Sequence, residues 1–265
     1  MLYLLDHPAV LFVVACVVLL IAHEIGYRLR ALAAHRDDKD WLKEVHDTRN
    51  QIALLLSLLL GFAMAMSLSR FDERKKLVSD EAGAIGTAYL RAEMQAEPVR
   101  SKAPALLREY LGTRIAVFGN VTINVDKQGA AELSRQIQDA LWRDAVTASQ
   151  QNPTPISALY VQSLNNVFDV DGARAEWVLN RVPVDIWILL SVLAIMTSVV
   201  VGYGQRHRSW MATFVPVLMV AIAVSLIADL DTPTTGFIQV SQQSLKSLAV
   251  EMDMHLPLPP TSDAH

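Results

Sequence analysis

Long apolar runs separated by charged stretches dominate the pattern of hydrophobic and polar positions along this chain. Four runs are long enough to cross a membrane as helices, because about 20 apolar residues span about 30 Å of hydrocarbon. They cover residues 9–27, 51–68, 184–203 and 210–228. The charged stretch 28–50 joins the first two runs. Residues 204–209 join the last two so closely that they predict an antiparallel helical hairpin.

The polar segment between the two pairs of runs has the periodicity of helices. Its apolar residues recur every three or four positions, and no alternation of period two is long enough for a sheet. Helix breaks are expected at Pro98, Gly119, Gly129 and residues 151–155. We therefore predict an all-α integral membrane protein with four transmembrane helices in two pairs and an inserted helical extramembrane domain.

This pattern also predicts the domain boundaries. The predicted parts are a first transmembrane pair (1–68), a helical extramembrane domain (69–183), a second transmembrane pair (184–229) and a C-terminal segment (230–265). The Pro-rich end of the last segment is expected to be disordered.

Composition and motifs exclude several classes of function. The net charge of −4 argues against nucleic acid as a partner, and the single cysteine, Cys16, excludes intrachain disulfides and cysteine-based metal clusters. Nucleotide-binding and nucleophile motifs are absent, so we expect no enzyme. Glu24 is the single ionisable candidate within the runs, and an ion pair with Arg28, four residues on, is expected. A proton-coupled transporter, which needs a buried charged relay, is therefore disfavoured.

Two acidic motifs elsewhere have simple interpretations. Residues 169–172 resemble a fragment of a calcium loop, but the remaining ligands are missing, so a turn at a helix end is expected. Asp80 and Glu81 have the charge to line a cation vestibule. Pairing of these residues with Lys76 or Arg74 on the helix surface is the interpretation we favour.

The second apolar run contains a candidate pore face. Leu54, Leu58 and Phe62 are spaced four apart and lie along one helix face, and Ser57 and Gly61 form a face of small residues that permits close helix approach. An apolar constriction gates a pore by dewetting and needs no charged residues. From the residues alone, contact with lipid or with a neighbouring helix remains the simpler interpretation.

A family resemblance changes this balance. Residues 59–62 (Leu-Leu-Gly-Phe), followed by Arg-Phe-Asp-Glu-Arg at 70–74, resemble the second transmembrane helix of bestrophins. The order of two spans, a helical domain, two spans and an acidic segment at 228–233 is also similar. Residues 69–90 and 229–242 resemble the bacterial bestrophin-like family more closely still, and the resemblance extends over most of 51–248.

The resemblance implies a homo-pentameric channel that conducts small inorganic ions passively through an axial pore. Leu54, Leu58 and Phe62 would form its hydrophobic neck. The resemblance also implies a bacterial plasma (inner) membrane location with the termini and helical domain in the cytoplasm, although the nearly balanced charge bias leans the other way. Besides its own copies, the expected partners are the lipid bilayer and the ions.

The remaining candidate site residues lie at the exit of the second span and after the fourth. Ser57, Gly61, Arg70 and Asp72 are expected to serve helix packing and the helix exit. Asp229 and Asp231 correspond to a possible ion or gating segment. Calcium is a candidate ligand there, but the acidic cluster is thin, and a turn held by Thr232 and Pro233 is the alternative. No cofactor is expected. The alternative function is a non-conducting membrane scaffold or sensor.

Overall fold

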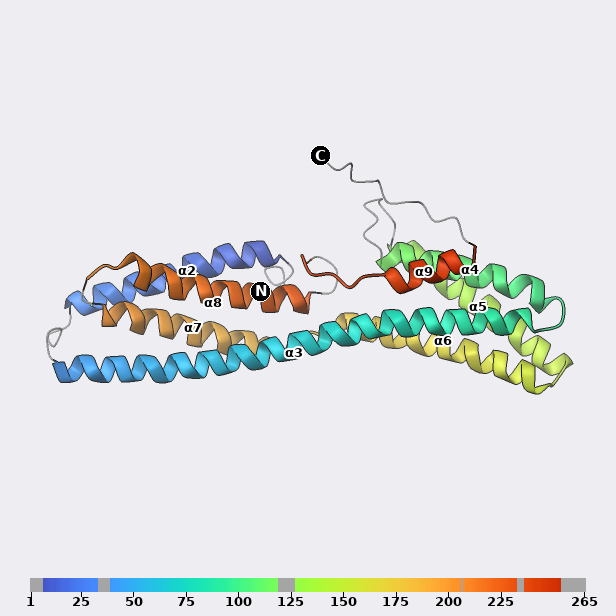
Figure 1. The fold of residues 1–265 in the computed structure, drawn as a ribbon, viewed down its shortest axis with the longest axis horizontal. Helices are drawn as coiled ribbons and strands as arrows, with labels where there is room; N and C mark the ends of the chain where they lie inside the picture. The colour runs from blue at the N-terminus through green and yellow to red at the C-terminus, as the bar shows by residue number, and fades with distance from the viewer. Residues whose placement is uncertain (1–6, 33–38, 119–126, 206, 233–235, 254–265) are drawn as a thin grey trace, which may run out of the picture. The chain divides into compact units, whose positions relative to one another are not determined.

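The computed structural model describes residues 7–32, 39–118, 127–205, 207–232 and 236–253. These residues form helices joined by short connections, and no strand occurs among them, so the all-α prediction is confirmed (Figure 1). The chain divides into two compact units. Unit 1 comprises residues 1–72 and 180–239, and unit 2 comprises residues 73–179 and 240–265. The Pro-rich end that is expected to be disordered (256–260), Gly119 and Pro233 lie outside the described residues.

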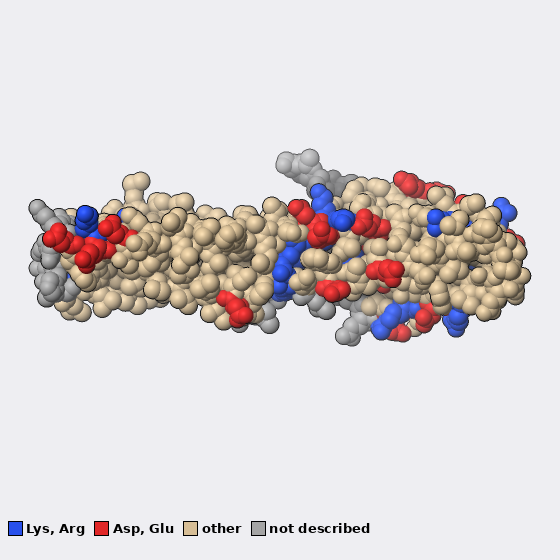
Figure 2. All heavy atoms as spheres, turned by 90° about the horizontal axis from the view of Figure 1, so that it is seen from below, with Lys and Arg blue, Asp and Glu red and all other residues tan. Residues whose placement is uncertain are grey.

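Unit 1 contains the membrane-spanning helices. They are α2 (Pro8–Leu32), the first part of α3 (Lys39–Glu93), α7 (Val184–Gly204) and α8 (Trp210–Asp231), and each is long and apolar enough to cross a membrane. Helix α2 packs against both α7 and α8. Figure 2 shows a broad face of this unit almost without charged side chains, with a group of charges at its end. The chain is a multi-pass membrane protein with the predicted four spans.

Two glycines allow α2 and α7 to cross at very short distance. A Cβ atom added to Gly26 would lie 2.0 Å from the carbonyl oxygen of Val199, and one added to Gly202 would lie 2.1 Å from that of His23. Each backbone thus occupies the space that a side chain on the other helix would need. Such close contact supplies packing energy in lipid, where apolar burial alone drives little association.

Helix α3 begins earlier than the sequence suggests. Residues 39–50, expected to belong to a charged connecting loop, form its first turns. This stretch has no glycine or proline to stop a helix, and Asp40 lies in the first turn, where a negative charge favours the helix dipole. The expected loop at 39–50 is wrong because a charged stretch without helix breakers also forms a helix that is exposed to water.

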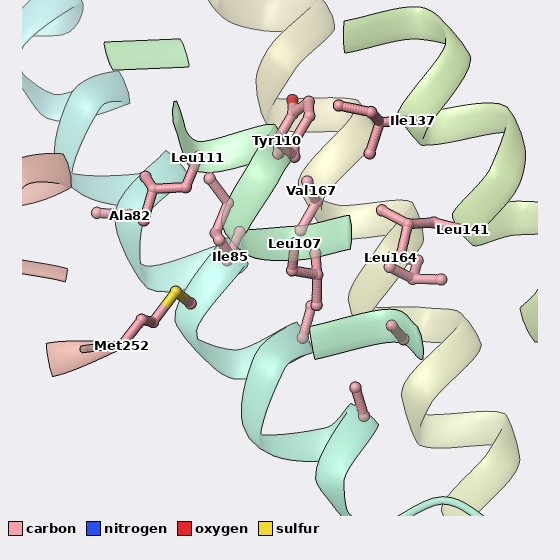
Figure 3. Packing of buried hydrophobic residues seen from close by; sticks show 14 of the residues in the cluster. Ala82, Ile85, Leu107, Tyr110, Leu111, Ile137, Leu141, Leu164, Val167 and Met252 are labelled. Atoms are coloured by element: carbon pink, nitrogen blue, oxygen red, sulfur yellow. The ribbon is translucent and has the colours of Figure 1, made fainter. Parts of the chain in front are cut away.

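Unit 2 contains the rest of α3 together with α4 (Val99–Phe118), α5 (Lys127–Gln151), α6 (Pro155–Leu179) and α9 (Gln243–Glu251). Its core joins residues from all of these helices (Figure 3). Fully buried members include Ile85 of α3, Leu107 and Tyr110 of α4, Leu141 of α5 and Leu164 of α6. Leu245 and Ala249 of α9 are buried in this core, so α9 belongs to this domain although it follows the fourth span.

The predicted breaks in unit 2 are only partly correct. Helix α6 begins at Pro155, a position where proline is favoured, and Thr154 and Ser157 cap it by accepting each other's backbone N–H at 3.2 and 3.0 Å. Gly129, in contrast, lies in the first turn of α5, which begins at Lys127, so it does not break the helix. Residues 169–172 lie within α6, so the expected turn there is wrong.

Candidate functional site

The first part of α3 has one packed face and one open face. Leu56, Ala63 and Ser67 are 3%, 1% and 0% exposed and form the face that packs within unit 1. Leu54 and Phe62 lie on the opposite side, with 72% and 62% of their surface exposed. The helical repeat of about 100° per residue places these two sets half a turn apart. The described residues therefore leave the candidate neck face uncovered.

The small residues belong to the same open face. Ser57 and Gly61 are exposed, and a Cβ atom added at Gly61 would meet nothing within 4 Å. Leu58, 55% exposed, lies between them and Phe62 around the helix. Since no described residue packs closely against either small residue, any close helix approach at this face is expected to involve another copy of the chain or another molecule.

Arg70 fastens the end of this span. Its Nη1 donates to Oδ1 of Asn180 at 2.5 Å, and its Nη2 lies 3.7 Å from Sδ of Met66. The contact ties α3 to the chain that leads into α7, within unit 1. Asp72, two residues further along, is exposed.

The acidic segment at the end of α8 binds backbone N–H groups. Asp229 is 4% exposed, and its two carboxylate oxygens accept the N–H groups of Phe237 at 2.6 Å and Ile238 at 3.0 Å. Asp231, equally buried, accepts the N–H of Val182 at 3.0 Å. A Cβ atom at Gly236 would lie 2.5 Å from Oδ1 of Asp229, so only glycine lets the chain fold back onto this carboxylate.

These contacts give both aspartates a structural task. They hold the chain before α7 and the chain after α8 against unit 1, and Thr232 closes α8 by donating to the carbonyl oxygen of Ala228 at 2.8 Å. Within the described part of the chain, His, Cys, Asp and Glu residues form no group of three or more suited to a metal ion. The candidate residues thus lie at three separate places in unit 1: along α3, at the exit of its span, and at the end of α8.

Sequence reasoning missed a charged cluster in the core of unit 2. Glu81 is fully buried and accepts from Nε of Arg114 at 2.5 Å and from Nη1 of Arg174. Arg114 also pairs with Asp171 at 2.5 Å, and Gln138 donates to that aspartate at 2.7 Å. The expected partners of Glu81, Lys76 or Arg74 on the helix surface, are therefore wrong.

Aromatic rings and a further helix complete the cluster. The Arg174 guanidinium lies 3.8 Å from the ring centroid of Phe118, and its Nη2 donates to Oε1 of Gln242 at 2.6 Å. Burial lowers the pKa of Arg174. Burial also acts to lower the pKa of Arg114, but Glu81, Tyr110 and Asp171 together outweigh this effect, so the pKa of that guanidinium is raised. The cluster connects α3, α4 and α6 with the segment before α9.

A signal for this cluster was present in the periodicity. Glu81 lies three residues after Val78 and four before Ile85, on the buried face of α3. A charge at such a position needs a partner of opposite sign. Which arginines supply it depends on contacts between helices that are distant in the sequence.

Comparison with known proteins fits this architecture. The family profile described as "Bestrophin-like domain" matches residues 12–245. The chain belongs to the bestrophin-like family. No curated protein matches it.

Several crystal structures of bacterial proteins share the bestrophin-like fold. One is a bestrophin homologue from Klebsiella pneumoniae phased with zinc, 13% identical, with a TM-score of 0.62 and coverage of 92% of this chain and 99% of the other. A single-substitution variant described by the same name and organism is 13% identical, with a TM-score of 0.63 and coverage of 91% of this chain and 97% of the other. A variant described only as a membrane protein is 12% identical, with a TM-score of 0.62 and coverage of 93% of this chain and 98% of the other. At these identities the comparisons establish the fold and the family profile establishes the membership.

Proposed function

We propose that this bestrophin-like chain assembles as a homo-pentamer around an axial pore and conducts small inorganic ions passively. In this proposal α3 lines the pore, and the protein lies in the plasma (inner) membrane with its termini and unit 2 in the cytoplasm. Family membership and the resemblance of the second span to the pore helix of bestrophin channels support the proposal. It includes no cofactor and no catalytic step.

One observation carries the proposal: the open face of α3 is apolar and lies opposite the face that packs within unit 1. Leu54, Leu58 and Phe62 project from it, and residues 51–68 contain no charged side chain. Several copies of such a face around an axis enclose a narrow apolar neck, in which water is unstable at small radius. The neck acts as a gate without fixed charge and therefore does not by itself select the sign of the ion.

Replacing the three neck residues together by alanine tests the gate. The triple variant widens the neck and is expected to raise single-channel conductance severalfold in a planar bilayer. A matched control replaces Val10, Val13 and Val17 of α2, which are 43%, 58% and 50% exposed, and should leave conductance within about twofold. Absence of current from both the wild type and the triple variant would remove the channel proposal.

The alternative is a non-conducting scaffold or sensor that uses unit 2 for assembly. Both functions predict membrane spans without internal charge, but they differ in the assembly. A dimer by mass measurement in detergent would favour the scaffold, because two copies of α3 do not enclose a neck. A larger ring without current in the bilayer assay would favour it as well.

A further inference from the structure

Two arginines converge on one carboxylate at the loop end of unit 1, which we define as the ends of α2 and α7 with the start of α8. Glu24 accepts from Nε of Arg28 at 2.8 Å, as its spacing predicts, and from Nη2 of Arg208 at 2.9 and 3.2 Å. The arginine side chains are 76% and 70% exposed and Glu24 is 37% exposed. Two cations share one anion, so the group carries an excess positive charge that faces outward.

The two guanidinium groups keep donors for a further anion. Each carries several N–H groups in a planar fork that matches a carboxylate or phosphate. Glu24 engages a single nitrogen of each arginine. The Arg208 guanidinium also lies 5.1 Å from the ring centroid of Tyr27, within the range of a cation–π contact, which places it beside α2.

Exposed apolar side chains lie next to this group on the membrane side. On α2, Ile21 and Ile25 precede Glu24 and Arg28 by three residues each, on the same helix face, and are 56% and 48% exposed. On α8, Trp210 stacks on Phe214 with ring centroids 4.7 Å apart. Trp210 is 79% exposed at the first position of the helix, where an aromatic ring meets the lipid headgroups.

We propose that the loop end of unit 1 binds the phosphate of an anionic phospholipid between Arg28 and Arg208, with the acyl chains along Ile21 and Ile25. The charge excess selects an anionic headgroup, and the apolar residues on the membrane side accept the chains. Glu24 accepts hydrogen bonds from both arginines and so competes with the phosphate for their donors. The site is independent of the proposed pore and requires no conduction.

The test measures the affinity of the purified full-length chain for phosphatidylglycerol, with phosphatidylcholine as the neutral lipid, by native mass spectrometry in a neutral detergent. The double variant Arg28→Gln with Arg208→Gln should bind phosphatidylglycerol about 30-fold more weakly, given the typical contribution of each basic residue at an anionic surface. The control Arg49→Gln, whose side chain contacts Asn50, should bind like the wild type. Equal affinity of the wild type for both lipids, or unchanged affinity of the double variant, would overturn the proposal.

Two further arms distinguish a lipid site from a purely structural ion pair and from a site for soluble phosphate. Glu24→Gln releases the arginines and should tighten phosphatidylglycerol binding severalfold, whereas a merely structural ion pair would give unchanged or weaker binding and would overturn the site. This variant keeps the test decisive if the double variant fails to fold. Inorganic phosphate at millimolar concentration should not displace the lipid. Complete displacement would identify a site for soluble phosphate and overturn the lipid proposal.

Discussion

Replacing Glu81 by glutamine removes one negative charge from the core of unit 2 and keeps the size of the side chain. In the wild type, Glu81 and Asp171 balance Arg114 and Arg174, and the Glu81 side chain has no exposed surface. Glutamine leaves two guanidinium groups facing one carboxylate, with an NH₂ group turned towards one of them. We expect a large loss of stability in unit 2.

The magnitude follows from the contacts. Removing one partner of a buried ion pair typically costs about 3–5 kcal/mol, and the one charge-assisted hydrogen bond that glutamine replaces by two facing donors accounts for about 1.5–3 kcal/mol of this cost. A domain of this size loses about 2–4 °C of its unfolding midpoint per kcal/mol. The midpoint of Glu81→Gln should therefore fall by about 6–20 °C.

Thermal unfolding of the full-length protein in detergent, combined with limited proteolysis to locate the opened region, measures this change. Asp80→Asn is the matched control, because it removes the same charge from the neighbouring, exposed position and should shift the midpoint by less than about 2 °C. A shift of Glu81→Gln as small as that of the control would refute the reasoning. Exchanging both Glu81 and Arg174 for methionine should cost less than Glu81→Met alone, since an unpaired charge is then removed as well.

Three other predictions concern single side chains. Gly202→Ala forces α2 and α7 apart and should lower the thermal midpoint. The control Gly172→Ala should not lower it, because a Cβ atom there meets nothing within 4 Å. Equal midpoints for the two variants would contradict the close crossing of α2 and α7. Burial raises the pKa of the Tyr160 hydroxyl in the folded protein, so the folded state favours its protonated form. The protein should therefore lose stability as the pH rises above about 10, the pKa of tyrosine in the unfolded chain. The Tyr160 hydroxyl lacks a hydrogen-bond partner among the described residues, so Tyr160→Phe should leave the thermal midpoint at pH 7 unchanged. The same variant should show a smaller fall of the midpoint in alkali than the wild type. A marked loss of the midpoint at pH 7 would argue against this. Asp229→Asn should accelerate hydrogen exchange of the two backbone amides that its carboxylate binds; unchanged exchange would show that these contacts are not needed.

The sequence was sufficient to predict the membrane spans, because the length of an apolar run is set by the thickness of the bilayer. The predicted spans 184–203 and 210–228 differ from α7 and α8 by at most three residues at their ends. The start of α3 was not predictable in this way, since a charged helix in water and a charged loop have the same composition. For Gly129, the predicted break missed the start of α5 by two residues, because glycine in a first helical turn looks the same in the sequence as glycine in a loop.

The candidate site was less accessible to sequence reasoning. The spacing of Leu54, Leu58 and Phe62 places them on one face, but one chain exposes pore-facing and lipid-facing side chains alike. The partners of Glu81 lie on α4 and α6, and no local pattern names them. Asp229 and Asp231 were recognised as unusual, but their backbone partners depend on how the chain returns after α8.

Electron cryo-microscopy of the full-length protein in lipid nanodiscs tests the central claim most directly. The account predicts a fivefold ring in which Leu58 of every copy faces a continuous opening on the symmetry axis. A dimer, or a ring in which Leu58 faces lipid and nothing is open along the axis, would contradict it.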